Sequence, residues 1–192
     1  MSTMQDRLAN ITLAPYILKA MALIGVSRKA GSNMFRHQMA TMAILLDYKI
    51  IDPVLLKASV IHDLFEDAPG MPGVSREEIV ALDSDGQAVY DLVMEVTQNT
   101  VDGKRESKVE YLRRLMESGS RQAKTLKLAD RISNLISLGF VHEERFVRKF
   151  LEETRKYVLP YAPEINPDMF REMSDLVADR EEKLKLRLPA SS

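Results

Sequence analysis

The segment from Val54 to Ala68 reads VLLKASVIHDLFEDA. It follows Asp52-Pro53, a strong helix start in which an acidic N-cap precedes proline at the first helical position. Pro69-Gly70 stops the segment, because proline cannot continue a helix and glycine favours a turn. The stretch therefore predicts one continuous, largely apolar helix.

Helical spacing recurs outward from this stretch in almost every apolar segment, and none shows the sustained alternation of a strand. Further helices are predicted around Pro15, with Ile17, Leu18, Met21 and Ile24 on one stripe, over 33–48, after a cap at Ser75, and over 86–98, 107–118, 122–138, 143–159 and about 167–187. The sequence has no repeat, low-complexity block or linker. We therefore expect an all-α fold, with residues 1–192 forming a single compact multi-helix domain.

Composition excludes several classes of protein. The 192 residues include 45% hydrophobic and 29% charged residues, the balance of an ordinary globular domain. The absence of cysteine excludes disulfides, thiolate zinc sites, iron–sulfur clusters and cysteine nucleophiles. With 27 basic and 28 acidic residues the formal charge is −1, so no overall basic field favours nucleic acid. No apolar run is long enough for a membrane span and the N-terminus lacks a secretory pattern, which predicts a cytoplasmic location.

An unusual group of polar residues interrupts the apolar stretch. His62 and Asp63 stand among aliphatic residues, and Glu66 and Asp67 follow them four positions later. In a continuous helix this spacing places the two pairs on one side. The acids also fall in the last helical turn, where the helix dipole disfavours carboxylates. Three acids and a histidine in this position favour a bound cation.

A plainer interpretation of the same residues stays open. Glu66 and Asp67 could be solvated, Asp63 could pair with an arginine, and His62 could be a hydrogen-bonded core histidine. That alternative weakens because a second apolar segment, KTLKLADRISNLISL over 124–138, carries a similar interruption at Asp130. One metal shared between the two segments would explain both acids.

These residues are similar to a known family. The order His37, His62-Asp63, Asp130 resembles the HD-domain metal phosphohydrolases. The segments RKAGSNMFRH (28–37), ASVIHDLFEDA (58–68) and LKLADRISNL (126–135) resemble the hydrolase domain of RelA/SpoT homologues and stand-alone small alarmone hydrolases. The similarity covers about residues 15–158, and the combined motifs are far more specific than an isolated His-Asp pair.

The resemblance implies a metal site and a catalytic pair. Its metal ligands would be His37, His62, Asp63 and Asp130, binding one divalent ion, which is Mn²⁺ in the family. Two imidazoles and two carboxylates suit manganese, iron or zinc better than calcium. The resemblance assigns Glu66 and Asp67 to the attacking water, a role that a carboxylate beside a metal can perform.

The resemblance also implies substrate contacts. Arg28 and Lys29 match the nucleotide-contacting pair of the family, Asn134 matches a nucleoside-site residue, and Lys104 matches a lysine near the substrate phosphates. A solvated basic face is the alternative for Lys104 and its neighbours Arg105 and Lys108. Three other residues are expected to be structural. Arg131 would form an ion pair, and Phe146 and Phe150 would belong to the core.

Four positions depart from the family pattern. Gln38 replaces the usual proline after the first histidine, Ala30 a small polar residue, Ala68 a threonine, and Ile136 an arginine near the nucleoside. The metal and water residues are complete, whereas part of the nucleotide pocket differs.

The function implied is metal-dependent hydrolysis of the 3′-pyrophosphate of (p)ppGpp to GDP or GTP and pyrophosphate, with a small nucleotide as the partner. An alternative keeps the site but changes the substrate, for example to the 2′-phosphate of NADPH. Another alternative is a nucleotide-binding module that has lost turnover.

Overall fold

The structure is a computed structural model that describes residues 3–186. Within that range its regular structure is helical, apart from one antiparallel hairpin of β1 (Thr100–Val101) and β2 (Lys104–Arg105) and one isolated bridge. The predicted all-α fold is confirmed. No helix in this range is long and apolar enough to cross a membrane.

Most of the longer helices begin and end close to the predicted positions. In chain order they are α1 (Met4–Ala9), α2 (Ala14–Ala20), the 3₁₀ turn η1 (Met21–Leu23), α3 (Met34–Asp47), α4 (Pro53–Ile61), α5 (Leu64–Asp67), α6 (Arg76–Val80), α7 (Gly86–Val96), α8 (Lys108–Ser118), α9 (Arg121–Leu138), α10 (Glu144–Tyr157), α11 (Ala162–Ile165) and α12 (Pro167–Leu186). The predicted start at Asp52 is a true N-cap, because its carboxylate accepts the Leu55 N–H at 2.8 Å. Residue 187, the last of the predicted C-terminal helix, lies outside the described residues.

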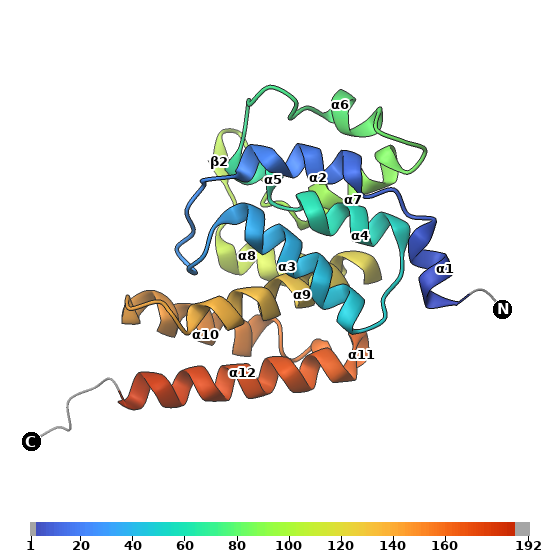
Figure 1. The fold of residues 1–192 in the computed structure, drawn as a ribbon. Coiled ribbons are helices and arrows are strands. Elements are labelled where there is room, and N and C mark those ends of the chain that lie inside the picture. The colour runs from blue at the N-terminus through green and yellow to red at the C-terminus, as the bar shows by residue number, and fades with distance from the viewer. Residues whose placement is uncertain (1–2, 187–192) are drawn as a thin grey trace, which may run out of the picture.

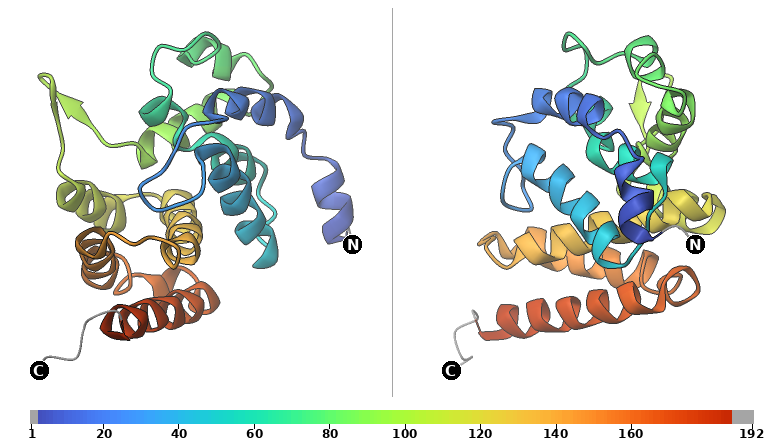
Figure 2. Two further views of the ribbon diagram at one scale, coloured as in Figure 1. Left: turned by 60° about the vertical axis from the view of Figure 1, so that its left-hand side comes forward. Right: turned by 45° about the vertical axis from the view of Figure 1, so that its right-hand side comes forward.

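Helix α9 is the centre of the molecule. It is buried without interruption from Thr125 to Ser133, and α3, α4, α7, α8, α11 and α12 all pack against it. Figure 1 shows α12 along the bottom with α9 above it, and α2 and α6 at the top. Figure 2 shows the β hairpin at the periphery, where it connects α7 to α8. Because this middle part of α9 is buried, its polar residues lie inside the molecule and need partners there.

The helix predicted over residues 53–68 is two helices, so that prediction was wrong. α4 ends at Ile61, and α5 begins only at Leu64. The His62 ring takes the Ser59 carbonyl as a hydrogen-bond partner at 2.8 Å, and Asp63 leaves the helical region with φ −100° and ψ 2°. The break lets His62 and Asp63 turn toward the centre of the molecule.

The apolar stripe predicted near Pro15 is not the buried face. Leu18, Met21 and Ile24 are exposed, and Leu18 is 67% accessible. The buried residues are Tyr16, Ala20 and Leu23, which also follow helical spacing but lie on a different face of α2 and η1.

Short elements were not predicted. α1, α11 and the hairpin have few apolar residues and give no periodic signal. Apart from Ala30 and Ile51, the buried hydrophobic residues in the described range form one cluster. The single domain over residues 1–192 stays a prediction.

Candidate active site

Three parts of the fold bring the predicted metal ligands together. His37 comes from α3, His62 and Asp63 from the break between α4 and α5, and Asp130 from α9. His37 Nε2 lies 3.1 Å from Asp130 Oδ1 and 3.4 Å from Asp63 Oδ2. His62 Nε2 lies 3.1 Å from Asp63 Oδ2 and 3.8 Å from Asp130 Oδ1. One ligand atom each from buried His37, His62 and Asp130 lies within 4.8 Å of the others, a spacing that could hold a metal ion.

The hydrogen bonds of His62 test whether a cation fits. Its Nδ1 must donate to the Ser59 carbonyl at 2.8 Å, since a carbonyl only accepts. Its buried Nε2 has no hydrogen-bond partner among the residues that the structure describes, although it faces carboxylate oxygens. In a neutral ring this nitrogen carries a lone pair, which carboxylates repel unless a cation lies between them. The donor set therefore fits a divalent metal.

The surrounding charges have the same consequence. Burial alone would lower the pKa of His62, but Asp63 and Asp130 raise it to about 10 when no ion is bound, so a proton then takes the place at Nε2 that a metal ion would occupy. Burial would raise the pKa of Asp130, but Lys127 and the two histidines hold it well below its usual range. The carboxylates are thus ionised, and they attract positive charge to this point.

Both carboxylate oxygens of Asp130 are also held by residues of its own helix. Asn134 Nδ2 donates to Oδ1 at 2.5 Å, and Lys127 Nζ lies 2.6 Å from Oδ2. Lys127 is buried, and it lies three residues before Asp130, about one turn of the same helix. A lysine three residues before an acid in an apolar run was a sequence signal for this pair, and it was missed.

A cavity of about 670 Å³ opens over these residues and contains both predicted catalytic acids. Glu66 Oε1 accepts the Gln98 backbone N–H at 2.9 Å, and its Oε2 pairs with Arg105. The Asp67 carboxylate has no hydrogen-bond partner in the described part of the chain. Partial desolvation, together with Asp63 and Glu66, raises the pKa of Asp67 to about 6. The two acids therefore have different environments.

One wall of the cavity carries the predicted nucleotide contacts. Arg28 Nη2 donates to Asn134 Oδ1 at 2.5 Å, and Lys29 lies beside Arg28 on the lining. Ala30 also lines the cavity, where it offers no polar group. Ile136 is 44% exposed and does not line the cavity, so its position supplies no contact there.

The cavity lining corrects the prediction for the basic cluster of Lys104, Arg105 and Lys108. Lys104 is exposed on β2 and does not line the cavity, whereas Arg105 and Lys108 do. Lys108 Nζ lies 4.5 Å from the centre of the Tyr111 ring, and Lys127 Nζ lies 4.9 Å from it. Burial, with nearby Lys127 and Arg131, lowers the pKa of Lys108 to about 8. The hairpin turns Lys104 away, which the sequence could not reveal.

Three residues expected to be structural also line the cavity. Arg131 was predicted to form an ion pair, but its contacts are the Thr154 hydroxyl at 3.2 Å and the Phe150 ring at 4.3 Å. Phe146 and Phe150, predicted as core, are only partly buried, and both lie on the cavity wall. Helix α10 therefore contributes a face to the site that the sequence interpretation did not include.

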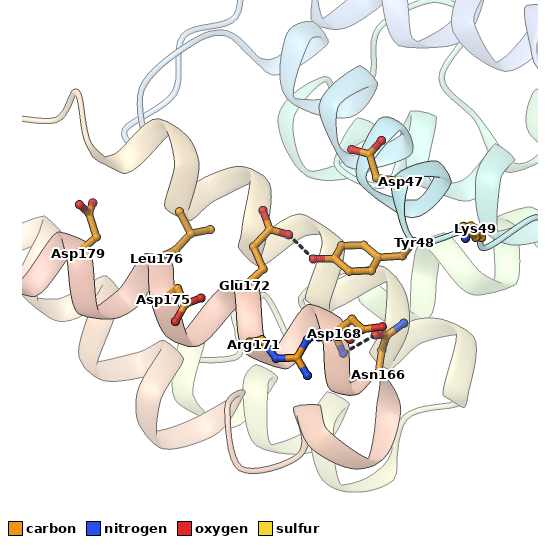
Figure 3. A pocket seen from close by; sticks show the side chains of 10 residues that line it. All are labelled: Asp47, Tyr48, Lys49, Asn166, Asp168, Arg171, Glu172, Asp175, Leu176 and Asp179. Atoms are coloured by element: carbon orange, nitrogen blue, oxygen red, sulfur yellow. Dashed lines mark hydrogen bonds and ion pairs between the residues drawn. The ribbon is translucent and has the colours of Figure 1, made fainter.

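A second cavity of about 740 Å³ lies between the end of α3 and α12 (Figure 3). Acidic side chains dominate its lining, and Glu172 accepts a hydrogen bond from Tyr48 there. None of the predicted site residues lines it. The larger cavity is thus separate from the histidines and from the candidate metal site.

Comparison with known proteins connects this geometry to a family. No family model matches the chain. GTP pyrophosphokinase rsh of Brucella ovis is 30% identical over 178 residues, which cover 81% of this chain and 23% of that protein. Guanosine-3′,5′-bis(diphosphate) 3′-pyrophosphohydrolase of Spiroplasma citri is 30% identical over 126 residues, covering 63% of this chain and 16% of that protein. The chain is homologous to a part of these two proteins.

A solved structure adds the fold. A metazoan ortholog of SpoT, described as hydrolysing ppGpp, matches with a TM-score of 0.71 and 23% identity, over 87% of this chain and 93% of that one. The resemblance to the hydrolase domain of RelA/SpoT homologues is confirmed in sequence and in fold. The chain spans less than a quarter of the length of its Rsh relatives. The roles of the individual site residues stay predictions.

Proposed function

We propose that the chain hydrolyses the 3′-pyrophosphate of (p)ppGpp, with a divalent metal, to GDP or GTP and pyrophosphate. The observation that carries this proposal is one cavity lined by His37, Asp130 and the acids Glu66 and Asp67. Buried His62 lies within ligand spacing of His37 and Asp130 beside that cavity. The Spiroplasma citri relative carries this activity in its name, and the metazoan neighbour is described as hydrolysing ppGpp.

Four residues would hold the metal in this proposal: His37, His62, Asp63 and Asp130. We propose Mn²⁺ as the ion, since nitrogen and carboxylate ligands together suit it. When bound, such an ion polarises phosphoryl oxygens and lowers the pKa of water.

Glu66 and Asp67 would have different roles toward the attacking water. Glu66 is already held by the Gln98 N–H and Arg105, so it is placed to orient the water. Asp67 has a free carboxylate with a raised pKa, so it can accept the proton of the water at neutral pH. The water oxygen joins the phosphorus next to the ribose, the bond from this phosphorus to the 3′-oxygen breaks, and that oxygen takes a proton.

The cations of the cavity would balance the phosphate charge. Arg28, Lys29, Arg105 and Lys108 all line the cavity, and Arg105 pairs with Glu66. A substrate with two diphosphate groups carries several negative charges, and charge pairing in a partly dry cavity is strong. Lys104 has no part in this proposal, because it does not line the cavity.

The nucleoside would lie near Arg28 and Asn134. Their mutual hydrogen bond fixes both side chains on the cavity wall. Ile136 supplies no hydrogen bond there, so we expect selectivity for guanosine to be looser than in the family. A nucleotide substrate is consistent with the cytoplasmic location expected from the sequence.

A substrate panel tests the proposal. The purified protein with Mn²⁺ is offered ppGpp, pppGpp, NADPH and common nucleotides, and the products are separated by chromatography. We expect GDP and pyrophosphate from ppGpp at the highest efficiency. Turnover of NADPH to NADH and phosphate without turnover of ppGpp would assign another substrate. Tight binding of ppGpp without products would indicate a binding module.

A further inference from the structure

Gln38 is a buried amide beside the candidate metal ligands. It follows His37 on α3 and is 0% exposed. Its Nε2 donates to Asp63 Oδ2 at 3.1 Å, while its Oε1 is buried with no hydrogen-bond partner in the described range. The flipped amide would place Oε1 against the Asp63 carboxylate, where two acceptors repel each other. The Nε2 atom therefore faces Asp63.

The unpartnered Oε1 means that the Gln38 side chain lowers the free energy of unfolding relative to an apolar side chain of the same size. A buried acceptor without a donor loses its hydration without replacement. An apolar side chain of the same size, such as methionine, would fill the position without that loss. A glutamine here is therefore explained by what its Nε2 does, not by packing.

Asp63 needs an external support that Asp130 does not. Both oxygens of Asp130 are held by residues of its own helix, Lys127 and Asn134. Asp63 lies at the break between α4 and α5, and its side chain is 24% exposed. Apart from the two histidines, Gln38 is the hydrogen-bond donor that reaches its carboxylate.

We propose that Gln38 is a positioning residue that fixes the rotation of the Asp63 carboxylate and thereby tunes metal affinity. This proposal rests on the metal site of the proposed function. The amide holds Oδ2 near the Nε2 atoms of both histidines, 3.4 Å from His37 and 3.1 Å from His62. Supporting hydrogen bonds of this kind typically change metal affinity by roughly 10–100-fold.

Manganese binding by Gln38→Met tests the proposal without relying on activity. Metal-free protein is titrated with Mn²⁺, and free ion is measured by its electron paramagnetic resonance signal. We expect the dissociation constant to rise roughly tenfold or more. The melting temperature of the metal-free variant should not fall, because the substitution also removes the unpartnered Oε1. A purely structural role would lower the melting temperature and leave the affinity of the folded protein unchanged.

Gln122→Met is the matched control. Gln122 also donates its amide to an aspartate, Asp52 at the start of α4, at 3.1 Å from Oδ2. Its replacement should leave manganese affinity unchanged. If Gln38→Met does not fold, Gln38→Leu serves in the same titration. Wild-type affinity in either folded Gln38 variant would overturn the proposal. Wild-type protein that binds Mn²⁺ but does not hydrolyse ppGpp would overturn the proposed function and leave the role of Gln38 intact.

Discussion

Asp130 connects the candidate metal site to the buried helix α9. It lies against both histidines and pairs with buried Lys127. We expect Asp130→Ala to lose bound metal and to lower the melting temperature, because the ion no longer stabilises the folded state and Lys127 is left unpaired. Metal analysis and thermal unfolding measure the two effects.

Asp52→Ala is the control for that substitution. Asp52 caps α4 away from the cavity, so its loss should lower stability by about 1 kcal/mol while metal occupancy stays unchanged. Equal metal content in Asp130→Ala and wild type would contradict the ligand assignment.

Glu66 and Asp67 should affect chemistry and not metal binding. Glu66→Gln and Asp67→Asn keep the shape of each side chain but remove its charge. We expect both variants to retain the metal and to slow hydrolysis by roughly 10²–10⁴-fold, the usual contribution of a placed acid or base. Initial rates and metal analysis on the same samples measure this. Loss of metal in either variant would make that carboxylate a ligand.

Lys108 should give substrate binding a pH dependence. Burial, with Lys127 and Arg131, lowers its pKa to about 8, so its positive charge is present below this pH and is lost as pH rises. We expect KM for ppGpp to increase from pH 7 to pH 9. In Lys108→Arg the increase should disappear, since arginine stays protonated. The same rise in KM in both proteins would show that another group titrates.

For single residues, the sequence indicated a site wherever a polar side chain interrupts an apolar segment. His62, Asp63 and Asp130 stood out because each interrupts a buried segment. Gln38 was noticed only as a departure from the family, because the sequence does not show where its amide points. Lys108 and Lys104 carry the same charge in one cluster, and only the position of the hairpin distinguishes them.

At the element scale, α9 depends on a partner at its C-terminus. Arg180 of α12 donates to the Leu135 carbonyl at 2.9 Å and the Ile136 carbonyl at 3.0 Å, two groups that have no partner within an ideal helix end. The contact joins α12 to the helix that carries Asp130 and Asn134. Positive charge also suits this end of a helix.

Removal of this cap should destabilise the fold and leave the metal site intact. We expect Arg180→Met to lower the free energy of unfolding by about 1–3 kcal/mol, the loss of hydrogen bonds to a charged donor. Urea unfolding measures the change. Manganese affinity should equal that of the wild type, because Arg180 does not line the cavity. A large loss of affinity with little change in stability would contradict a purely structural role for the cap.

Helix boundaries were predicted well where caps mark them. Asn33, Asp52, Ser107 and Ser120 are all N-caps whose side chains accept a backbone N–H. The break at His62 was not predicted, because it arises from a side-chain bond to Ser59 and from contacts with distant helices. Because the break was not predicted, the sequence analysis placed Asp63, Glu66 and Asp67 on one side of a continuous helix.

At the scale of the whole molecule, the all-α class followed from helical spacing, but the cavity did not. Its walls come from segments far apart in sequence, including the loop before α3, α8 and α10. Phe146 and Arg131 illustrate the difficulty, because their spacing on a helix fits a core position and a cavity wall equally well. Packing around α9 decides between the two.

The measurement that most directly tests the central claim is pyrophosphate release from ppGpp during a titration of metal-free protein with Mn²⁺. We predict no release from the stripped protein, a rise in rate with added Mn²⁺, and a plateau at one ion per chain. Asp130→Ala should stay inactive over the same range. Undiminished hydrolysis by the stripped wild-type protein would contradict the proposed metal dependence. No pyrophosphate release although the ion binds would contradict the proposed hydrolysis of ppGpp.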